Sequence, residues 1–124
     1  MKYEGTKLPN FEPRTEPVKE LEITDIEVGT GAELQPGATV TVHYTGALVK
    51  NGIIFQSSLD FGNTISFGLD QVIKGWTHGV PGMKIGGTRR LVIPAEMAYG
   101  SVSPASNIPA NSDLVFDIDL VAIK

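Results

Sequence analysis

Strict alternation of apolar and polar residues in two long segments is the feature that most limits what this chain can fold into. In the segment TVTVHY the apolar residues Val40, Val42 and Tyr44 share one face, and the residues between them are polar. The segment LVFDIDLVA, which starts at Leu114, keeps both of its aspartates off the apolar face. A period of two residues is typical of strands that are buried on one side of an antiparallel sheet.

Shorter signals supply further strands. Residues 21–28 (LEITDIEV) predict a strand whose alternation slips once near Asp25, which indicates a β-bulge. The pair Asn51–Gly52 predicts a hairpin turn, after which the segment IIFQSS forms the returning strand. Residues 88–94 (TRRLVIP) predict another strand.

Only one segment, residues 69–80 (LDQVIKGWTHGV), has good helical spacing. Its apolar residues recur at i, i+3, i+4, i+7 and i+11, namely Leu69, Val72, Ile73, Trp76 and Val80. Asp70 is the expected N-cap. Gly75 and Gly79 each cost up to about 1 kcal/mol of helix propensity relative to alanine, so the helix must be stabilised by packing. We therefore expect an α+β fold, an antiparallel sheet with one face covered by a single short helix.

A length of 124 residues suits one domain. Residues 1–20 contain Pro9, Pro13 and Pro17 among many charged residues, which blocks a helix there. We predict a flexible N-terminal leader over residues 1–20 and one compact domain over residues 21–124.

Composition narrows the classes of partner. The net charge of −4 disfavours nucleic acid, and no apolar run approaches the roughly 20 residues that cross a bilayer, so we expect neither nucleic acid nor membrane as a partner. The absence of cysteine excludes disulfides and thiolate chemistry. No signal peptide is visible, which favours a cytoplasmic location. An exported form, or one tethered through a trimmed leader, stays open.

Most catalytic chemistry lacks its residues in this chain. His43 and His78 are far apart and are interpreted as surface or partly packed side chains, so no metal or cofactor is expected. Residues 57–58 are both serine but lack a nucleophile elbow, and are interpreted as hydrogen-bonding groups at a strand end. Asp117 and Asp119 are interpreted as a solvated strand face.

Aromatic residues remain, and their order along the chain is informative where their number alone would indicate only a core. Seven motifs occur in sequence: VHYTG (42–46), F-x-SS (55–58), VIKGW (72–76), GVPGMKIGGTRRLVIP (79–94), AYG (98–100), IPA (108–110) and LVFDIDL (114–120). Together they closely resemble the FKBP-type peptidyl-prolyl cis–trans isomerases over residues 21–124.

The resemblance implies a five- or six-stranded antiparallel β-sheet wrapped around one short α-helix, with substrate proline entering between helix and sheet. It assigns catalytic positions to Tyr44, Phe55, Trp76, Tyr99 and Phe116. It assigns substrate-binding positions to Gln56, Ile65, Phe67, Val72, Ile73 and Ile108. Trp76 would form the pocket floor, the Ile73 N–H and the Tyr99 hydroxyl would hold substrate carbonyls, and Ile108 would lie at the lip.

Two positions depart from the family pattern. Gln56 stands where aspartate is common, and Ile65 stands where an aromatic residue is common. We expect activity to survive and affinity for macrolide inhibitors such as rapamycin to weaken. The short loop over residues 100–113 lacks the chaperone insert of some relatives, which disfavours a general folding helper.

Two functions stay open at this stage. The first is a monomeric isomerase that acts on proline-containing polypeptides, with an apolar residue preferred before the proline. The second is a binding module that recognises a proline-containing segment with low turnover.

Overall fold

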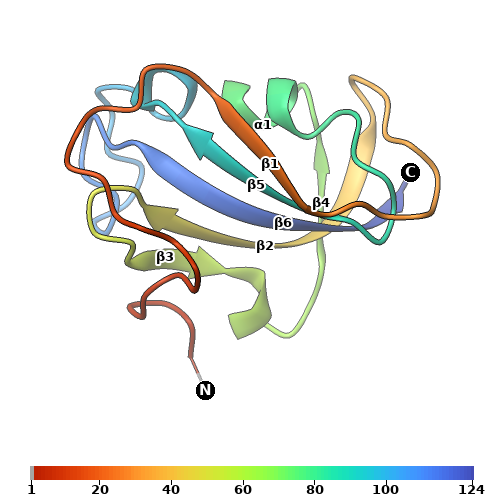
Figure 1. The fold of residues 1–124 in the computed structure, drawn as a ribbon, viewed down its shortest axis with the longest axis horizontal. Coiled ribbons are helices and arrows are strands. Elements are labelled where there is room, and N and C mark those ends of the chain that lie inside the picture. The colour runs from red at the N-terminus through yellow and green to blue at the C-terminus, as the bar shows by residue number, and fades with distance from the viewer. Residues whose placement is uncertain (1) are drawn as a thin grey trace.

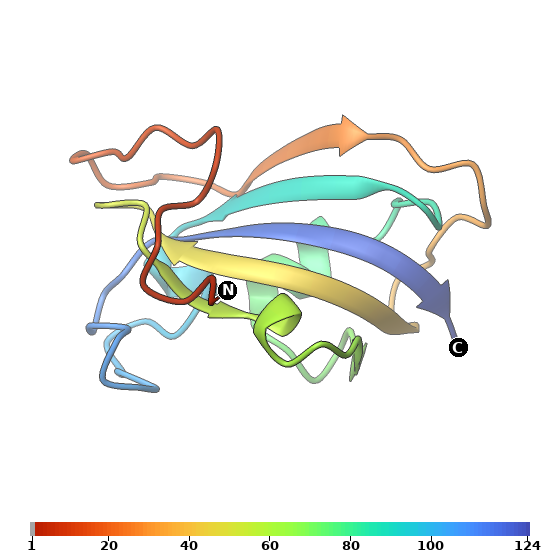
Figure 2. The same ribbon diagram turned by 90° about the horizontal axis from the view of Figure 1, so that it is seen from below.

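The computed structural model describes residues 2–124, which form one antiparallel sheet and one α-helix (Figure 1). The strands are β1 (Glu22–Glu27), β2 (Thr39–Leu48), β3 (Ile54–Ser57), β4 (Ile65–Gly68), β5 (Thr88–Ile93) and β6 (Leu114–Ile123). Their order in the sheet is β1-β5-β6-β2-β3, and β4 also pairs with β2. The helix α1 (Lys74–Gly79) lies against one face of the sheet (Figure 2). The predicted α+β fold is confirmed.

The alternating segments form the two longest strands, which pair along almost their whole length. Val40, Val42 and Tyr44 are buried on the face that carries α1, as their period predicts. The register of β1 against β5 shifts between Asp25 and Glu27, which confirms the predicted bulge. None of the helices within residues 2–124 is both long and apolar enough to span a bilayer.

Helix α1 is shorter than the segment predicted for it, and Asp70 does not cap it. Its N-cap is Ile73, whose backbone is extended (φ −58°, ψ 150°) and whose side chain makes no capping bond. The preceding residues are still engaged with the sheet, because the Leu69 N–H donates to the Ala38 carbonyl. The Thr77 hydroxyl also donates to the Leu69 carbonyl and fixes this turn on the helix.

Gly75 and Gly79 let α1 approach β5 more closely than other residues would. A Cβ at Gly75 would lie 2.5 Å from an Ile93 side-chain atom, and one at Gly79 would lie 2.8 Å from Leu91. Side chains do not pack at such distances, so both glycines are required by the helix–sheet contact. Their low helix propensity is offset by this packing.

We predict that Gly75→Ala destabilises the protein although alanine is the better helix former. Overpacking against Ile93 should lower the free energy of unfolding by about 1–3 kcal/mol. Urea denaturation followed by tryptophan fluorescence measures this loss. His78→Ala, at an exposed position of the same helix, is the matched control and should change stability by no more than about 0.5 kcal/mol. A more stable Gly75→Ala protein would contradict the packing argument.

The N-terminal segment that we predicted as a flexible leader packs against the outer face of the sheet and pairs with its β3 edge. The Gly5 N–H donates to the Ile54 carbonyl and the Ile54 N–H donates to the Thr6 carbonyl, both at 2.8 Å. Leu8 and Val18 are buried there in a second apolar cluster, completed by Ala47, Val49, Ile54, Val92 and Val115. The prolines keep the segment irregular but do not prevent it from docking.

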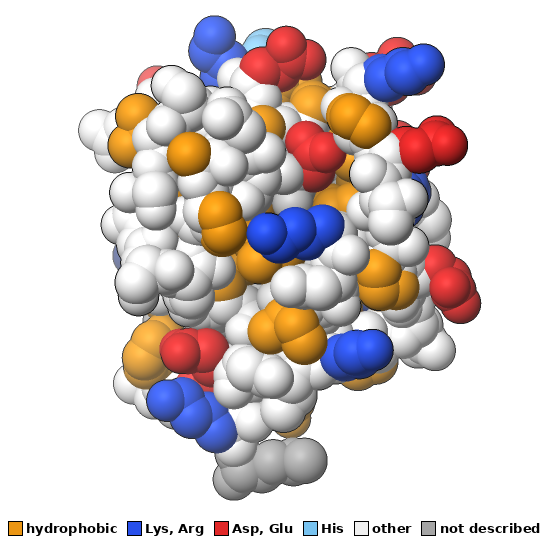
Figure 3. All heavy atoms as spheres, turned by 90° about the vertical axis from the view of Figure 1, so that its left-hand side faces the viewer, with side chains coloured by type: hydrophobic (Ala, Val, Ile, Leu, Met, Phe, Trp, Pro, Cys, Tyr) orange, Lys and Arg blue, Asp and Glu red, His pale blue; other side chains and the backbone are white. Residues whose placement is uncertain are grey.

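Arg90 holds the middle of this segment, residues 9–11, in place by several contacts. Its guanidinium makes a bidentate ion pair with Asp117, and it also donates to the carbonyls of Pro9 and Asn10. The same guanidinium lies 5.7 Å from the ring centroid of Phe11, a cation–π distance. Figure 3 shows the side of the molecule that lies at the left of Figure 1, where the N-terminal segment meets loops of the sheet. Acidic and basic side chains are interspersed on this face, with no large patch of one sign.

Asp60 fastens the beginning of the segment, and this contact depends on pH. Its carboxylate accepts the N–H groups of Tyr3 at 2.6 Å and Glu4 at 2.9 Å, and these bonds, chiefly that of Tyr3, hold the pKa of Asp60 below its ordinary value of 3.8. A lowered pKa means that the ionised carboxylate favours the docked segment. The contact is therefore complete above pH 3.8 and is lost as the pH falls through the lower folded-state pKa.

We expect the amide resonances of Tyr3 and Glu4 to move together when the protein is acidified below pH 3.8, because both lose a charged acceptor. Two-dimensional NMR measures these shifts. In Asp60→Asn the titration should disappear, since the amide cannot ionise. Asp70→Asn, at an exposed position outside the N-terminal segment, should leave the titration of Tyr3 and Glu4 intact. An unchanged titration in Asp60→Asn would exclude Asp60 as the anchor.

Candidate active site

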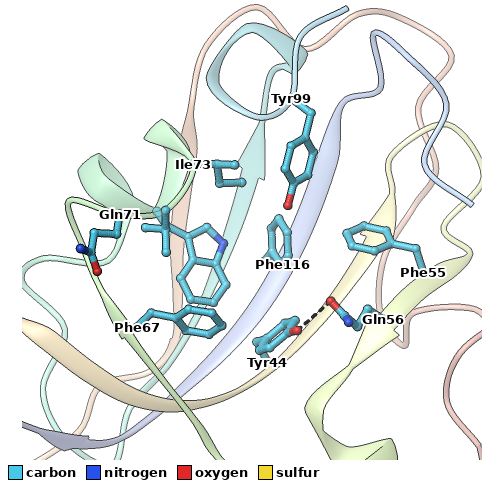
Figure 4. Close-up of a pocket in the computed structure, with 10 residues that line it drawn as sticks. Tyr44, Phe55, Gln56, Phe67, Gln71, Ile73, Tyr99 and Phe116 are labelled. Atoms are coloured by element: carbon cyan, nitrogen blue, oxygen red, sulfur yellow. Dashed lines mark hydrogen bonds between the residues drawn. The ribbon is translucent and has the colours of Figure 1, made fainter. Parts of the chain in front are cut away.

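A pocket of about 470 Å³ opens between α1 and the sheet (Figure 4). It is lined by Tyr44, Phe55, Gln56, Phe67, Gln71, Val72, Ile73, Trp76, Tyr99 and Phe116. These residues come from β2, β3, β4, β6, the helix and its entrance, and the loop that carries Tyr99. The fold thus gathers almost all of the predicted site residues into one concavity.

Edge-to-face aromatic packing builds the pocket floor. The Trp76 indole is buried, and its centroid lies 5.6 Å from Tyr44, 5.4 Å from Phe67 and 5.4 Å from Phe116. The ring planes of these three contacts are inclined by 79°, 76° and 86°. Such geometry sets the positive edge of one ring against the negative face of another and adds stabilisation beyond area burial. The floor is therefore rigid and apolar.

The wall formed by Tyr44 and Gln56 is polar but neutral. The Tyr44 hydroxyl donates to Gln56 Oε1 at 2.7 Å (Figure 4). Burial raises the pKa of Tyr44, and nearby Tyr99 adds a smaller Coulombic contribution in the same direction. The phenol therefore keeps its proton at neutral pH and donates a hydrogen bond to Gln56.

Two hydrogen-bond donors at the rim are free to meet a ligand. The Ile73 N–H and the Tyr99 hydroxyl have no hydrogen-bond partner within residues 2–124. The extended backbone of Ile73 explains the first, since this residue precedes the first turn of α1. The Tyr99 hydroxyl points toward the pocket (Figure 4). An acceptor such as a peptide carbonyl fits both.

Two predicted site residues lie outside the pocket lining. Ile65 pairs with Val42 at the start of β4 and packs, partly buried, against the main core. Ile108 is buried in that core and anchors the loop that carries Tyr99. Conversely, the exposed Gln71 lines the pocket without having been predicted. The sequence offered one signal for Gln71, its position next to Val72, which was predicted to bind substrate.

The two serines after Gln56 hold the end of β3, as their interpretation from sequence required. Ser58 is fully buried, and its hydroxyl oxygen accepts the Tyr44 N–H at 2.8 Å and lies 2.9 Å from His43 Nδ1. Ser57 shares a hydrogen bond with the Thr45 hydroxyl at 2.8 Å. These contacts fix the backbone on either side of the wall.

Comparison with known proteins decides the family. The model of the family "FKBP-type peptidyl-prolyl cis-trans isomerase" matches residues 31–121. This chain belongs to that family. A probable FK506-binding protein of Corynebacterium glutamicum is 47% identical, with 84% of this chain and 87% of the relative covered. The peptidyl-prolyl cis-trans isomerase FPR2 of Saccharomyces cerevisiae is 42% identical, with 82% and 84% covered.

Solved FKBP-type structures share the fold. A peptidyl-prolyl cis-trans isomerase of Pseudomonas syringae superposes with a TM-score of 0.75 at 36% identity, covering 84% of this chain and 75% of that one. FkpA of Escherichia coli superposes with a TM-score of 0.76 at 41% identity, covering 90% and 53%. The chain is thus a peptidyl-prolyl isomerase of the FKBP type, built on the six-stranded sheet and single α-helix described above.

We predict that Gly46→Ala damages the pocket of this FKBP-type domain. A Cβ at Gly46 would lie 2.6 Å from Phe55 Cζ and 2.7 Å from Phe116 Cε1, so it would force apart two rings that meet at 87°. We expect kcat/KM on a proline peptide to fall roughly tenfold and stability to fall by about 1–3 kcal/mol. Wild-type kcat/KM in a folded Gly46→Ala protein would show that the rings relax freely.

Proposed function

We propose that this isomerase works by holding the twisted X–Pro amide in its aromatic pocket, without covalent chemistry. The barrier of roughly 18–20 kcal/mol is the loss of amide resonance, and rotation breaks no covalent bond. A twisted amide has less charge separation than a planar one, so an apolar floor favours it over the planar form. Only such differential stabilisation raises the rate.

The observation that carries this mechanism is the combination of a rigid ring floor with two unpaired donors at its rim. In the proposed complex the proline ring lies on Trp76, between Tyr44 and Phe116. The Ile73 N–H and the Tyr99 hydroxyl donate hydrogen bonds to the carbonyls that flank the rotating bond. An apolar residue before the proline would meet the remaining ring surface.

We further propose that macrolides bind in the same pocket, more weakly than they would bind beside a carboxylate. Support for binding comes from relatives named FK506-binding proteins. Support for the weaker affinity comes from the neutral amide of Gln56, whose oxygen already accepts a hydrogen bond from the Tyr44 hydroxyl. We also propose that the monomer is the active unit, because one chain by itself supplies the floor, the walls and both rim donors of the pocket.

Tyr99→Phe tests the mechanism. Removing the free hydroxyl should lower kcat/KM by roughly two- to tenfold, the equivalent of one hydrogen bond of about 0.5–1.5 kcal/mol. An isomer-coupled assay on an Ala-Leu-Pro-Phe peptide measures the change. Tyr3→Phe, at an exposed tyrosine on the N-terminal segment, is the matched control. Unchanged kcat/KM and peptide affinity in Tyr99→Phe would remove this role.

The same assay separates the catalyst from a binding module of low turnover. The wild-type protein should accelerate isomerisation, and an excess of rapamycin should abolish the acceleration. Peptide binding without any rate above background would contradict the proposed mechanism.

A further inference from the structure

Phe55 occupies an irregular position in β3. Gly46 pairs with Gln56 and the adjacent Ala47 pairs with Ile54, so two residues of β2 face three residues of β3. Phe55 is the extra residue and has no ladder partner. A β-bulge re-aims a side chain and leaves its residue outside the regular pairing. The bulge directs the Phe55 ring against Phe116. Because Phe55 has no partner in the ladder, another contact must hold its backbone.

That contact comes from a residue far away in the chain. Asn107 Nδ2 donates to the Phe55 carbonyl at 2.8 Å. The amide nitrogen must be the donor, because the Phe55 carbonyl oxygen can only accept. The neighbouring Ile54 is held by the N-terminal segment, so the outer edge of β3 is fixed by two sequence-distant partners.

Asn107 projects from a loop that is itself held firmly. It lies in a turn closed by the Ile108 N–H, which donates to the Ala105 carbonyl. Ile108 is buried in the core, and the Asn111 N–H donates to the Gly100 carbonyl and closes the loop at its base. Tyr99, which immediately precedes Gly100, is carried by this same loop. Figure 4 shows Tyr99 and Phe55 on adjoining sides of the pocket.

We propose that Asn107 is a positioning residue of the isomerase, whose side-chain amide ties the bulged Phe55 backbone to the Tyr99 loop and so sets the separation of these two walls. The inference rests on the roles proposed above for Phe55 and Tyr99. Asn107 itself does not line the pocket. Losing its amide would let the Phe55 wall and the Tyr99 loop move independently, and the substrate would meet a wider, less defined groove.

Asn107→Asp and Asn107→Ala test the proposal together. At pH 7.5 the aspartate is a carboxylate, which cannot donate, and alanine has no polar group. Each should lower kcat/KM roughly five- to tenfold, the effect of losing one hydrogen bond that positions the Phe55 backbone. Exchange NMR on a proline peptide measures the rate without a coupling protease and is usable over a wide pH range.

The pH profile distinguishes positioning from a general structural loss. On acidification from pH 7.5 to 4.5, about one fifth of the Asn107→Asp carboxyl, with its ordinary pKa near 3.9, becomes protonated and gains an O–H that can donate to the Phe55 carbonyl. Its kcat/KM relative to wild type should therefore rise about two- to threefold, whereas that of Asn107→Ala should stay low. A flat ratio in Asn107→Asp, or wild-type kcat/KM in Asn107→Ala, would overturn the proposal.

Asn51→Asp is the matched control. Asn51 uses its oxygen, Oδ1, to accept the Ile53 N–H at 2.8 Å, and a carboxylate retains that acceptor. The same change of charge close to β3 should therefore leave kcat/KM within about twofold of wild type. A loss equal to that of Asn107→Asp would assign the effect to charge and would overturn the proposal.

A structural readout keeps this test separate from the proposed function. The ¹³C resonance of the Phe55 carbonyl should move in Asn107→Ala and stay in Asn51→Asp, whether or not the protein is active. If the wild type shows no isomerase activity, the proposed mechanism fails while the carbonyl shift still reports the tie. If the wild type is active and the Phe55 carbonyl does not move in Asn107→Ala, the tie is absent and the inference fails.

Discussion

The packing of the Trp76 indole against three other rings is the interaction on which the rest of the site depends. It requires the helix to lie close to β5, and that approach is possible only because Gly75 and Gly79 lack side chains at the contact. The helix is too short to be stable alone, so its position is determined by this packing. The floor of the pocket and the stability of the helix therefore have one physical cause.

The walls of the pocket are held by different forces. Strand β3 has four residues and lies at the edge of the sheet, so its own pairing is a weak constraint. Ile54 receives support from the N-terminal segment, and the residue after it is bulged and bonded to Asn107. Ser58 then joins the end of this wall to β2, because its hydroxyl accepts the Tyr44 N–H and donates to the Tyr44 carbonyl. A wall that looks local in sequence is thus assembled from segments about 50 residues away in either direction.

Sequence patterns predicted the parts of the fold that depend on local period. The alternation in β2 and β6, the slip near Asp25 and the turn at Asn51–Gly52 all appear in the structure. The helix boundary did not follow from periodicity, because the Leu69 carbonyl accepts the Thr77 hydroxyl, whereas in a helix begun at Leu69 it would accept the Ile73 N–H.

The N-terminal segment shows the same limit. Its prolines correctly exclude a helix, but its docking depends on Leu8 and Val18 meeting apolar residues on the outer face of the sheet. Asp117 and Asp119 were interpreted as a solvated face of β6, but Val115 on the same face is buried beneath this segment and Asp117 is paired with Arg90. Gln71 escaped prediction for a similar reason, since its place on the pocket rim follows from the turn before α1.

The neutrality of the pocket is compatible with the reaction, because rotation about an X–Pro bond requires no charged group. A planar X–Pro amide has the larger dipole, so a fixed charge beside it would stabilise the ground state as well as the twisted form. Tyr44 and Gln56 instead satisfy each other, and the raised pKa of Tyr44 keeps the phenol uncharged. The remaining donors, the Ile73 N–H and the Tyr99 hydroxyl, face the flanking carbonyls in the proposed complex. Catalytic power then rests on how accurately these donors and the rings are placed, and contacts outside the pocket control that accuracy.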